Sequence, residues 1–296
     1  MNNFGRVITA MITPFDQEGN VNYGGVAELS KYLVDHGSEG ILAGGTTGEG
    51  ATLSEEEKIK LYKTVIESVG DKAYVIGNAG GIDTESIIRF IKKIENIGLD
   101  ALLVIVPFYV KPTQEGMYRH FKKIADSTKL PIILYNVPGR TGANILPETV
   151  KRLTDVCENI VGIKDAVGNW EQTTKERILL PENFLIYSGD DSFTLPLISI
   201  GGAGVISVAS HIIGDEMLEL VKAAESGNLK EAAKIHLKYY RMMKELFFIT
   251  NPIPVKTAIN LMGLPGGTFR LPMVEASEKE ENFVKDLLKF YGDIVF

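Results

Sequence analysis

The sequence feature that most constrains this fold is a set of short apolar runs that recur through the first 210 residues. Their starts lie roughly thirty residues apart, which is about the length of one strand–helix unit. The runs are rich in β-branched residues and almost continuously hydrophobic, as expected of strands buried on both faces. The predicted strands cover residues 7–13, 40–43, 74–79, 101–107, 131–137, 160–166, 184–189 and 204–209.

Amphipathic helical patterns lie between these runs. Ser54 followed by Glu57 is a capping-box sequence, and Gly98 is a typical helix stop. The alternation predicts an α/β fold, a (β/α)8 TIM barrel. A doubly wound open sheet is the structural rival, but it would normally have fewer strands and a nucleotide-binding first turn. The expected helices cover residues 23–36, 53–69, 84–97, 114–127 and 147–156.

The strand signal stops after Ser210, and the rest of the chain has helical patterns. The last barrel helix is expected at residues 215–225, and further helices at 229–248, 254–262 and 278–291. The turn-forming sequence Ser226-Gly227-Asn228 predicts a boundary. We therefore expect a catalytic barrel over residues 1–225 and a C-terminal helical appendage over residues 226–296.

Composition excludes several classes of protein. The chain has 296 residues, is 45% hydrophobic and carries a net charge of −7 without a basic block, so no nucleic-acid partner is expected. It has no apolar run long enough for a membrane span and no signal-peptide pattern. One cysteine, Cys157, and four scattered histidines have no metal-ligand spacing. These features predict a cytoplasmic, metal-independent protein.

Polar residues gather just after several predicted strands. In a barrel of this kind, chemistry takes place at the carboxyl ends of the strands, so these residues are expected to meet at one mouth. They are residues 44–49 after the second strand, Phe108 and Tyr109 after the fourth, Tyr135 and Asn136 at the end of the fifth, and residues 188–191 after the seventh.

Lys164 is the sharpest functional signal, because it lies inside an otherwise apolar strand. Burying a charged amine is unfavourable, and desolvation lowers its pKa. A neutral amine can attack a carbonyl carbon, which is how a Schiff-base lysine acts. The alternative is a structural lysine paired with Asp165 or another acid at the strand end.

Tyr135 precedes Lys164 by one strand–helix unit, so the two residues are expected on adjacent strands. Imine formation needs protons delivered to the carbinolamine oxygen, and a tyrosine hydroxyl can shuttle them. Thr46 could link Tyr135 to a second hydroxyl such as Tyr109. Each tyrosine alone could equally be an amphipathic core residue.

Two further features could bind an anion. The glycine-rich turn at residues 44–48 would let the backbone amides of Thr46 and Thr47 hold a carboxylate. Arg140, in a tight Pro-Gly-Arg loop, could bind a carboxylate through two hydrogen bonds, or could be a solvated loop residue. Residues 201–204, also rich in glycine, precede the eighth strand on the side away from the mouth, so we expect close packing there.

Together, these motifs resemble the dihydrodipicolinate synthase family, within the pyruvate-dependent class I aldolase and lyase superfamily. The resemblance covers nearly the whole chain. The arginine after Tyr-Asn-Val-Pro distinguishes this family from sialic-acid lyases and sugar-acid aldolases, which usually lack it. The motifs are Gly45-Thr46-Thr47-Gly48-Glu49, Tyr135-Asn136-Val137-Pro138-Gly139-Arg140, Gly162-Ile163-Lys164 and Asn251-Pro252-Ile253-Pro254-Val255-Lys256.

The resemblance implies a reaction between pyruvate, held as an imine on Lys164, and L-aspartate 4-semialdehyde, early in diaminopimelate and lysine synthesis. It implies a proton relay of Thr46, Tyr109 and Tyr135, with Tyr109 donated across a dimer interface. Arg140 would bind the semialdehyde carboxylate. Thr47, Gly189 and Ile206 would line the pyruvate pocket. The family is typically a homotetramer that uses no metal or organic cofactor.

Three questions stay open at this stage. A sister aldolase that cleaves a 2-keto-3-deoxy sugar acid or a sialic acid would also need Lys164, although not Arg140. An inactive barrel used as a binding module is the alternative from another class. In lysine-inhibited relatives, histidines, a tyrosine and an asparagine occupy the positions that here hold Glu55, Lys58, Phe108 and Gly81, so weak or absent inhibition by lysine is expected.

Overall fold

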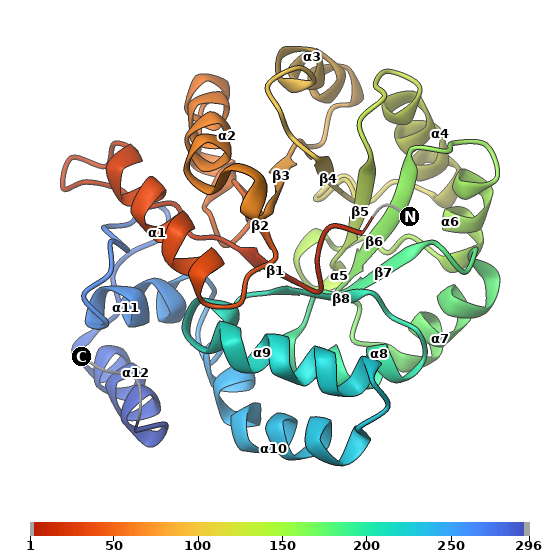
Figure 1. Ribbon diagram of the computed structural model, residues 1–296. Coiled ribbons are helices and arrows are strands. Elements are labelled where there is room, and N and C mark those ends of the chain that lie inside the picture. The colour runs from red at the N-terminus through yellow and green to blue at the C-terminus, as the bar shows by residue number, and fades with distance from the viewer. Residues whose placement is uncertain (1–2, 293–296) are drawn as a thin grey trace.

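A closed barrel of eight parallel strands forms the centre of the molecule (Figure 1). The computed structural model describes residues 3–292. The strands follow one another around the barrel in chain order, which confirms the predicted (β/α)8 fold and excludes the open sheet. They are β1 (Val7–Ala10), β2 (Gly40–Ala43), β3 (Tyr74–Asn78), β4 (Ala101–Ile105), β5 (Ile132–Asn136), β6 (Ile160–Asp165), β7 (Leu185–Ser188) and β8 (Gly204–Ser207).

Helices surround this barrel (Figure 1). The predicted capping box is present, because the Ser54 side chain accepts from the amide of Glu57 and the Glu57 side chain accepts from the amide of Ser54. The helices are α1 (Tyr23–Asp35), α2 (Glu55–Val69), α3 (Thr84–Ile94), α4 (Gln114–Ala125), α6 (Pro147–Thr154), α7 (Trp170–Leu179), α8 (Thr194–Ser199) and α9 (Ser210–Glu225).

The helix after β8 begins earlier than the sequence predicts. We expected it at residue 215, but α9 begins at Ser210 and contains a non-helical residue, Ile213. Gly214 follows this kink and lies against the carbonyl of His36, where a Cβ atom would overlap the oxygen. The predicted start was therefore five residues too late; Gly214 has no side chain, so α9 can pass close to His36 at the end of α1.

The C-terminal helices pack outside the barrel: the first two contact α9, and the third contacts the second (Figure 1). They are α10 (Leu229–Glu245), α11 (Ile253–Leu261) and α12 (Glu278–Phe290), close to the predicted ranges. The proposed domain boundary after Glu225 falls in the turn between α9 and α10. Within residues 3–292, no helix combines the length and hydrophobicity that a membrane span requires.

The N-terminal segment closes one end of the barrel. Phe4 is buried, its amide donates to the Tyr187 hydroxyl at 3.4 Å, and its ring meets Tyr74 edge-on. Gly204 at the start of β8 lies so close to the carbonyl of Arg6 that a Cβ atom there would overlap it, which confirms the close packing expected of residues 201–204. Chemistry is therefore confined to the opposite end, where β5 and β6 carry Tyr135 and Lys164.

Candidate active site

Lys164 and Tyr135 lie side by side on adjacent strands. They are register partners on β6 and β5, and both are buried, with 6% and 7% of their surface exposed. The Lys164 amino group lies 4.6 Å from the centroid of the Tyr135 ring. Their predicted adjacency is therefore confirmed.

Burial makes the amine of Lys164 reactive. Desolvation lowers the pKa of Lys164 to about 8, and the positive charge of Arg140 acts in the same direction, whereas Asp191 opposes both. The alternative partner, Asp165, directs its carboxylate elsewhere: it accepts hydrogen bonds from the hydroxyl of Thr173 and the amide of Val167. At neutral pH a usable fraction of Lys164 is thus the free amine that attacks carbonyl carbons.

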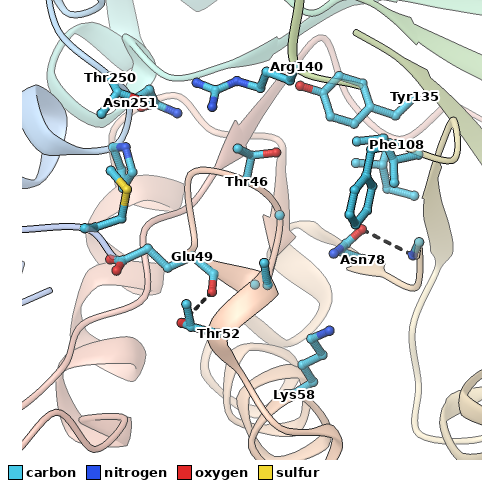
Figure 2. A pocket seen from close by; sticks show the side chains of 18 of the residues that line it. Thr46, Glu49, Thr52, Lys58, Asn78, Phe108, Tyr135, Arg140, Thr250 and Asn251 are labelled. Atoms are coloured by element: carbon cyan, nitrogen blue, oxygen red, sulfur yellow. Dashed lines mark hydrogen bonds between the residues drawn. The ribbon is translucent and has the colours of Figure 1, made fainter. Parts of the chain in front are cut away.

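The phenol of Tyr135 is held in its protonated form. Burial raises the pKa of Tyr135, while the charge of Arg140 and a hydrogen bond with the Thr46 side chain lower it and partly offset the effect of burial. In Figure 2, Thr46 lies below Tyr135 and Arg140 at the edge of the same cavity. A hydroxyl pair of this kind can pass a proton to and from a reacting oxygen.

The turn after β2 is held by residues distant in sequence. The Thr47 hydroxyl accepts a hydrogen bond from the Asn251 side chain at 2.9 Å. The carbonyl of Gly44 accepts from the side chain of Asn78 at 2.8 Å, and the carbonyl of Asn78 accepts from the Tyr62 hydroxyl at 2.6 Å. The two threonines therefore lie on a rigid turn, as preorganised catalytic groups require.

Arg140 lies in the tight turn expected from the sequence. Pro138–Thr141 forms a single helical turn, α5, which is closed by a hydrogen bond from the amide of Gly142 to the carbonyl of Pro138. Figure 2 shows the Arg140 side chain extending from beside Tyr135 toward Thr250 and Asn251. Pro138 occupies the start of this turn, where its fixed φ angle favours a helical conformation.

Two adjoining cavities meet at these residues. One, of about 250 Å³, contains Lys164 and Gly189; the other, of about 280 Å³, opens toward Phe108 and Lys58. Cavities of this size suit metabolites of a few heavy atoms rather than large cofactors. The residues common to both walls are Thr46, Leu103, Tyr135, Arg140 and Asn251.

Six of the eight candidate residues line the Lys164 cavity, and two do not. Ile206 is buried inside the barrel, and the cavity wall is formed instead by its neighbour Val208. Tyr109 is 85% exposed and adopts a positive φ of 70°. Its amide donates to the carbonyl of Thr141 at 3.2 Å, which places it beside the turn of Arg140. The six that line the cavity are Thr46, Thr47, Tyr135, Arg140, Lys164 and Gly189.

The structure adds groups that sequence reasoning did not single out. Asp191 is buried and accepts from the Ser207 hydroxyl and the amides of Val208 and Ala209, so it holds the end of β8. Burial raises the pKa of Asp191 to about 6. Asp191 belongs to the polar residues predicted after the seventh strand, but its hydrogen-bond partners at the end of β8 could not be predicted from the sequence. Among residues 3–292, no group of His, Cys, Asp and Glu side chains could hold a metal ion.

Comparison with known proteins decides the family. Residues 3–291 match the model of the Dihydrodipicolinate synthetase family. The chain belongs to this family. It is 50% identical over 285 residues to 4-hydroxy-tetrahydrodipicolinate synthase of Desulforamulus reducens, covering 96% of both chains. The corresponding protein of Bacillus subtilis is 49% identical over 278 residues, covering 94% of this chain and 96% of the relative.

Solved structures of the dihydrodipicolinate synthase family superpose closely. The enzyme from Aquifex aeolicus has a TM-score of 0.96 at 40% identity, with 99% of each chain covered. The enzyme from Cyanidioschyzon merolae, solved with lysine bound, has a TM-score of 0.95 at 44% identity and 98% coverage of each chain. The predicted resemblance is confirmed along nearly the full length.

Proposed function

We propose that this chain is a lyase that condenses pyruvate with L-aspartate 4-semialdehyde to give 4-hydroxy-tetrahydrodipicolinate, in the synthesis of diaminopimelate and lysine. The observation that carries the proposal is the buried amine of Lys164 facing the ring of Tyr135 at 4.6 Å. Membership of the dihydrodipicolinate synthase family supports the same reaction.

The first half of the reaction makes a carbon nucleophile. The free amine of Lys164 adds to the C2 carbonyl of pyruvate. Tyr135, supported by Thr46, passes one proton from the nitrogen to the new oxygen and then gives its own proton, so that the oxygen leaves as water and the C2–nitrogen bond becomes an iminium. Loss of a C3 proton to the Tyr135 oxygen gives the enamine and restores the phenol. The low dielectric of the buried site strengthens the hydrogen bonds through which Tyr135 and Thr46 pass these protons.

The second half joins the two substrates. The C3 carbon of the enamine attacks the aldehyde carbon of the semialdehyde, and the resulting alkoxide is protonated. The substrate amine then adds to the iminium carbon and displaces Lys164, which closes the ring and frees the enzyme. Arg140 binds the semialdehyde carboxylate, a role supported by its place in the walls of both cavities. The amides of the Thr46-Thr47 turn, with the backbone of Gly189 and the end of β8 around Ile206, hold the pyruvate carboxylate.

The remaining proposals concern cofactor, assembly and location. We propose that the reaction uses no metal or organic cofactor, since the imine on Lys164 activates pyruvate. We propose a cytoplasmic homotetramer, a dimer of dimers, in which Tyr109 completes the relay of a neighbouring subunit. The exposure of Tyr109 and its positive φ support this role. One similar structure is described as a monomeric dihydrodipicolinate synthase variant, so assembly requires its own measurement.

Trapping with borohydride tests the proposal. Borohydride added with pyruvate is expected to attach a reduced pyruvyl group to the peptide that contains Lys164, and pyruvate plus the semialdehyde should give the cyclic product. Modification of another lysine, with none at Lys164, would contradict the mechanism. Cleavage of sugar acids or sialic acid, without condensation, would show instead a sister aldolase. Failure to trap pyruvate at all would favour an inactive binding module.

A further inference from the structure

A buried ion pair lies beneath the site without touching the reacting groups. The Lys256 amino group lies 2.7 Å from the carboxylate of Glu49, and the two side chains are 0% and 1% exposed. Lys256 belongs to α11 and Glu49 to the turn after β2, so the pair joins the C-terminal helices to the barrel mouth.

The surroundings of the pair are built around the charges. The Lys256 amine lies 4.4 Å from the ring centroid of Phe15 and 4.8 Å from that of Phe269. The second oxygen of Glu49 accepts from the amide of Arg270 at 3.2 Å. Desolvation lowers the pKa of Lys256, whereas Glu49 opposes this effect. Because well-packed apolar residues often stabilise a fold as well as a buried ion pair does, stability alone does not account for this arrangement.

Glu49 is bonded directly to the catalytic turn. Its amide donates to the carbonyl of Thr46 at 3.1 Å, and its carbonyl accepts from the Thr52 hydroxyl at 2.9 Å. Its φ is 50°, a left-handed conformation that is unfavourable for a residue with a side chain. An anchor on the side chain is therefore needed to keep the turn in this shape, and Lys256 supplies it.

A second contact joins the turn after β2 to the segment that precedes Lys256. Asn251, five residues before Lys256, donates to the Thr47 hydroxyl at 2.9 Å. Thr46 is thus held on both sides. Its carbonyl accepts from the amide of Glu49, and the next residue, Thr47, is hydrogen-bonded to Asn251. Glu49 also lines the second cavity, and Figure 2 shows its carboxylate on the side opposite Tyr135, with Thr46 between them.

We propose that Glu49 and Lys256 are positioning residues for the reaction: their ion pair holds the Thr46 hydroxyl against Tyr135. This inference rests on the proposed function. A shift of about 1 Å in a catalytic group lowers rates by about a hundredfold, so a relaxed turn would lower kcat without removing any residue of the relay.

The test is a double-mutant cycle with Thr46. Glu49→Gln combined with Lys256→Met removes both charges at similar volume, so neither partner is left as an unpaired buried charge. We expect this variant to fold, with a melting temperature near that of the wild type. We expect kcat to fall by about tenfold or more, with a smaller change in the KM for pyruvate.

Thr46→Val is then added to both backgrounds. In the wild type it should lower kcat by about a hundredfold, the scale of a lost proton relay. In the charge-free variant the further loss should be only about tenfold or less, so that the triple variant is no slower than Thr46→Val alone, because the hydroxyl is already misplaced. If the two losses multiply, or if the charge-free variant keeps wild-type kcat, the positioning role is overturned.

Two controls keep the outcomes separate. Arg6→Met with Glu39→Gln removes the 2.8 Å ion pair of these residues, together with the contact of Arg6 with Glu225, at the opposite end of β1 and β2, and should leave kcat unchanged. If the charge-free variant does not fold, Glu49→Asp replaces it, because it keeps both charges but shortens the anchor by one methylene, and the same criterion for Thr46→Val applies. Wild-type enzyme that fails to trap pyruvate on Lys164 contradicts the proposed function. Wild-type trapping with multiplicative losses contradicts only the positioning role.

Discussion

The amino group of Lys164 lies over the face of the Tyr135 ring rather than against a carboxylate. An aromatic face attracts a cation more weakly than a carboxylate does, so it leaves the neutral amine accessible. The same contact places the Tyr135 side chain next to the carbon that Lys164 would attack. One register pair therefore brings together the proposed nucleophile and its proposed proton donor.

Imine formation should depend on pH through Lys164. Burial lowers the pKa of Lys164 to about 8. The fraction of Lys164 in the neutral form therefore rises about tenfold per pH unit below that value and becomes nearly constant above it. The rate of borohydride trapping at limiting pyruvate, measured from pH 6 to 9.5, should follow this curve. A rate that does not change across this range would show that the amine is not the titrating group.

Lys164→Met should abolish activity and stabilise the fold. The pKa of Lys164 is lower in the folded state than in the unfolded state, so burying the protonated lysine opposes folding at low pH. This unfavourable free energy disappears as the pH rises from about 8 through the unfolded pKa near 10.5. The variant should gain about 1–4 kcal/mol in unfolding free energy at pH 7. The gain should shrink at pH 10. Denaturant unfolding at both values provides the measurement, and a destabilised variant would contradict this account.

Tyr135→Phe should slow condensation by about a hundredfold or more, as expected for a lost proton relay. The ring is kept, so the barrel packing should not change, and circular dichroism provides the control. Steady-state turnover with both substrates is the measurement. Near-native turnover would remove Tyr135 from the mechanism.

Arg140→Ala should weaken use of the semialdehyde while sparing imine formation. A charge-assisted bond to a carboxylate contributes about 1.5–3 kcal/mol, or roughly ten- to two-hundredfold in kcat/KM for that substrate. Arg140→Lys is the matched variant, since it keeps the charge and loses the paired hydrogen bonds. Loss of pyruvate trapping in Arg140→Ala would mean that this residue binds the first substrate or supports the fold.

L-Lysine should inhibit weakly or not at all. Lys58 and Phe108 line the second cavity where the resemblance implies side chains that bind lysine in regulated relatives. Glu55 pairs with Lys93, and Glu85 pairs with Lys123, so both carboxylates are already engaged. Initial rates against lysine concentration provide the test. Half-maximal inhibition below about a millimolar, roughly −4 kcal/mol of binding, would contradict the prediction.

Sequence reasoning identified the barrel because strand burial and spacing are local properties. It placed Lys164 beside Tyr135 because consecutive parallel strands in a barrel are neighbours. It did not predict α7, whose inward face buries Thr173 and Glu176 rather than an apolar stripe.

The contacts between segments distant in sequence also could not be predicted from the sequence. The contact of Asn251 with Thr47 and the pairing of Lys256 with Glu49 each cross more than 200 residues of sequence. The hydrophobic periodicity of a segment predicts its own secondary structure, but it does not predict which distant residue a side chain will contact. Only the closed barrel, with α11 packed beside it, shows that these residues meet.

The same two contacts set the order in which the enzyme is completed on the ribosome. All eight strands are present once Ser207 has been made, and N-terminal regions generally fold first during synthesis. The turn that carries Thr46 then still lacks its anchors, because residues 251–256 have not yet emerged. A chain that has reached Ser207 but not Asn251 therefore contains Lys164 and all eight strands, and lacks both contacts on the turn that carries Thr46.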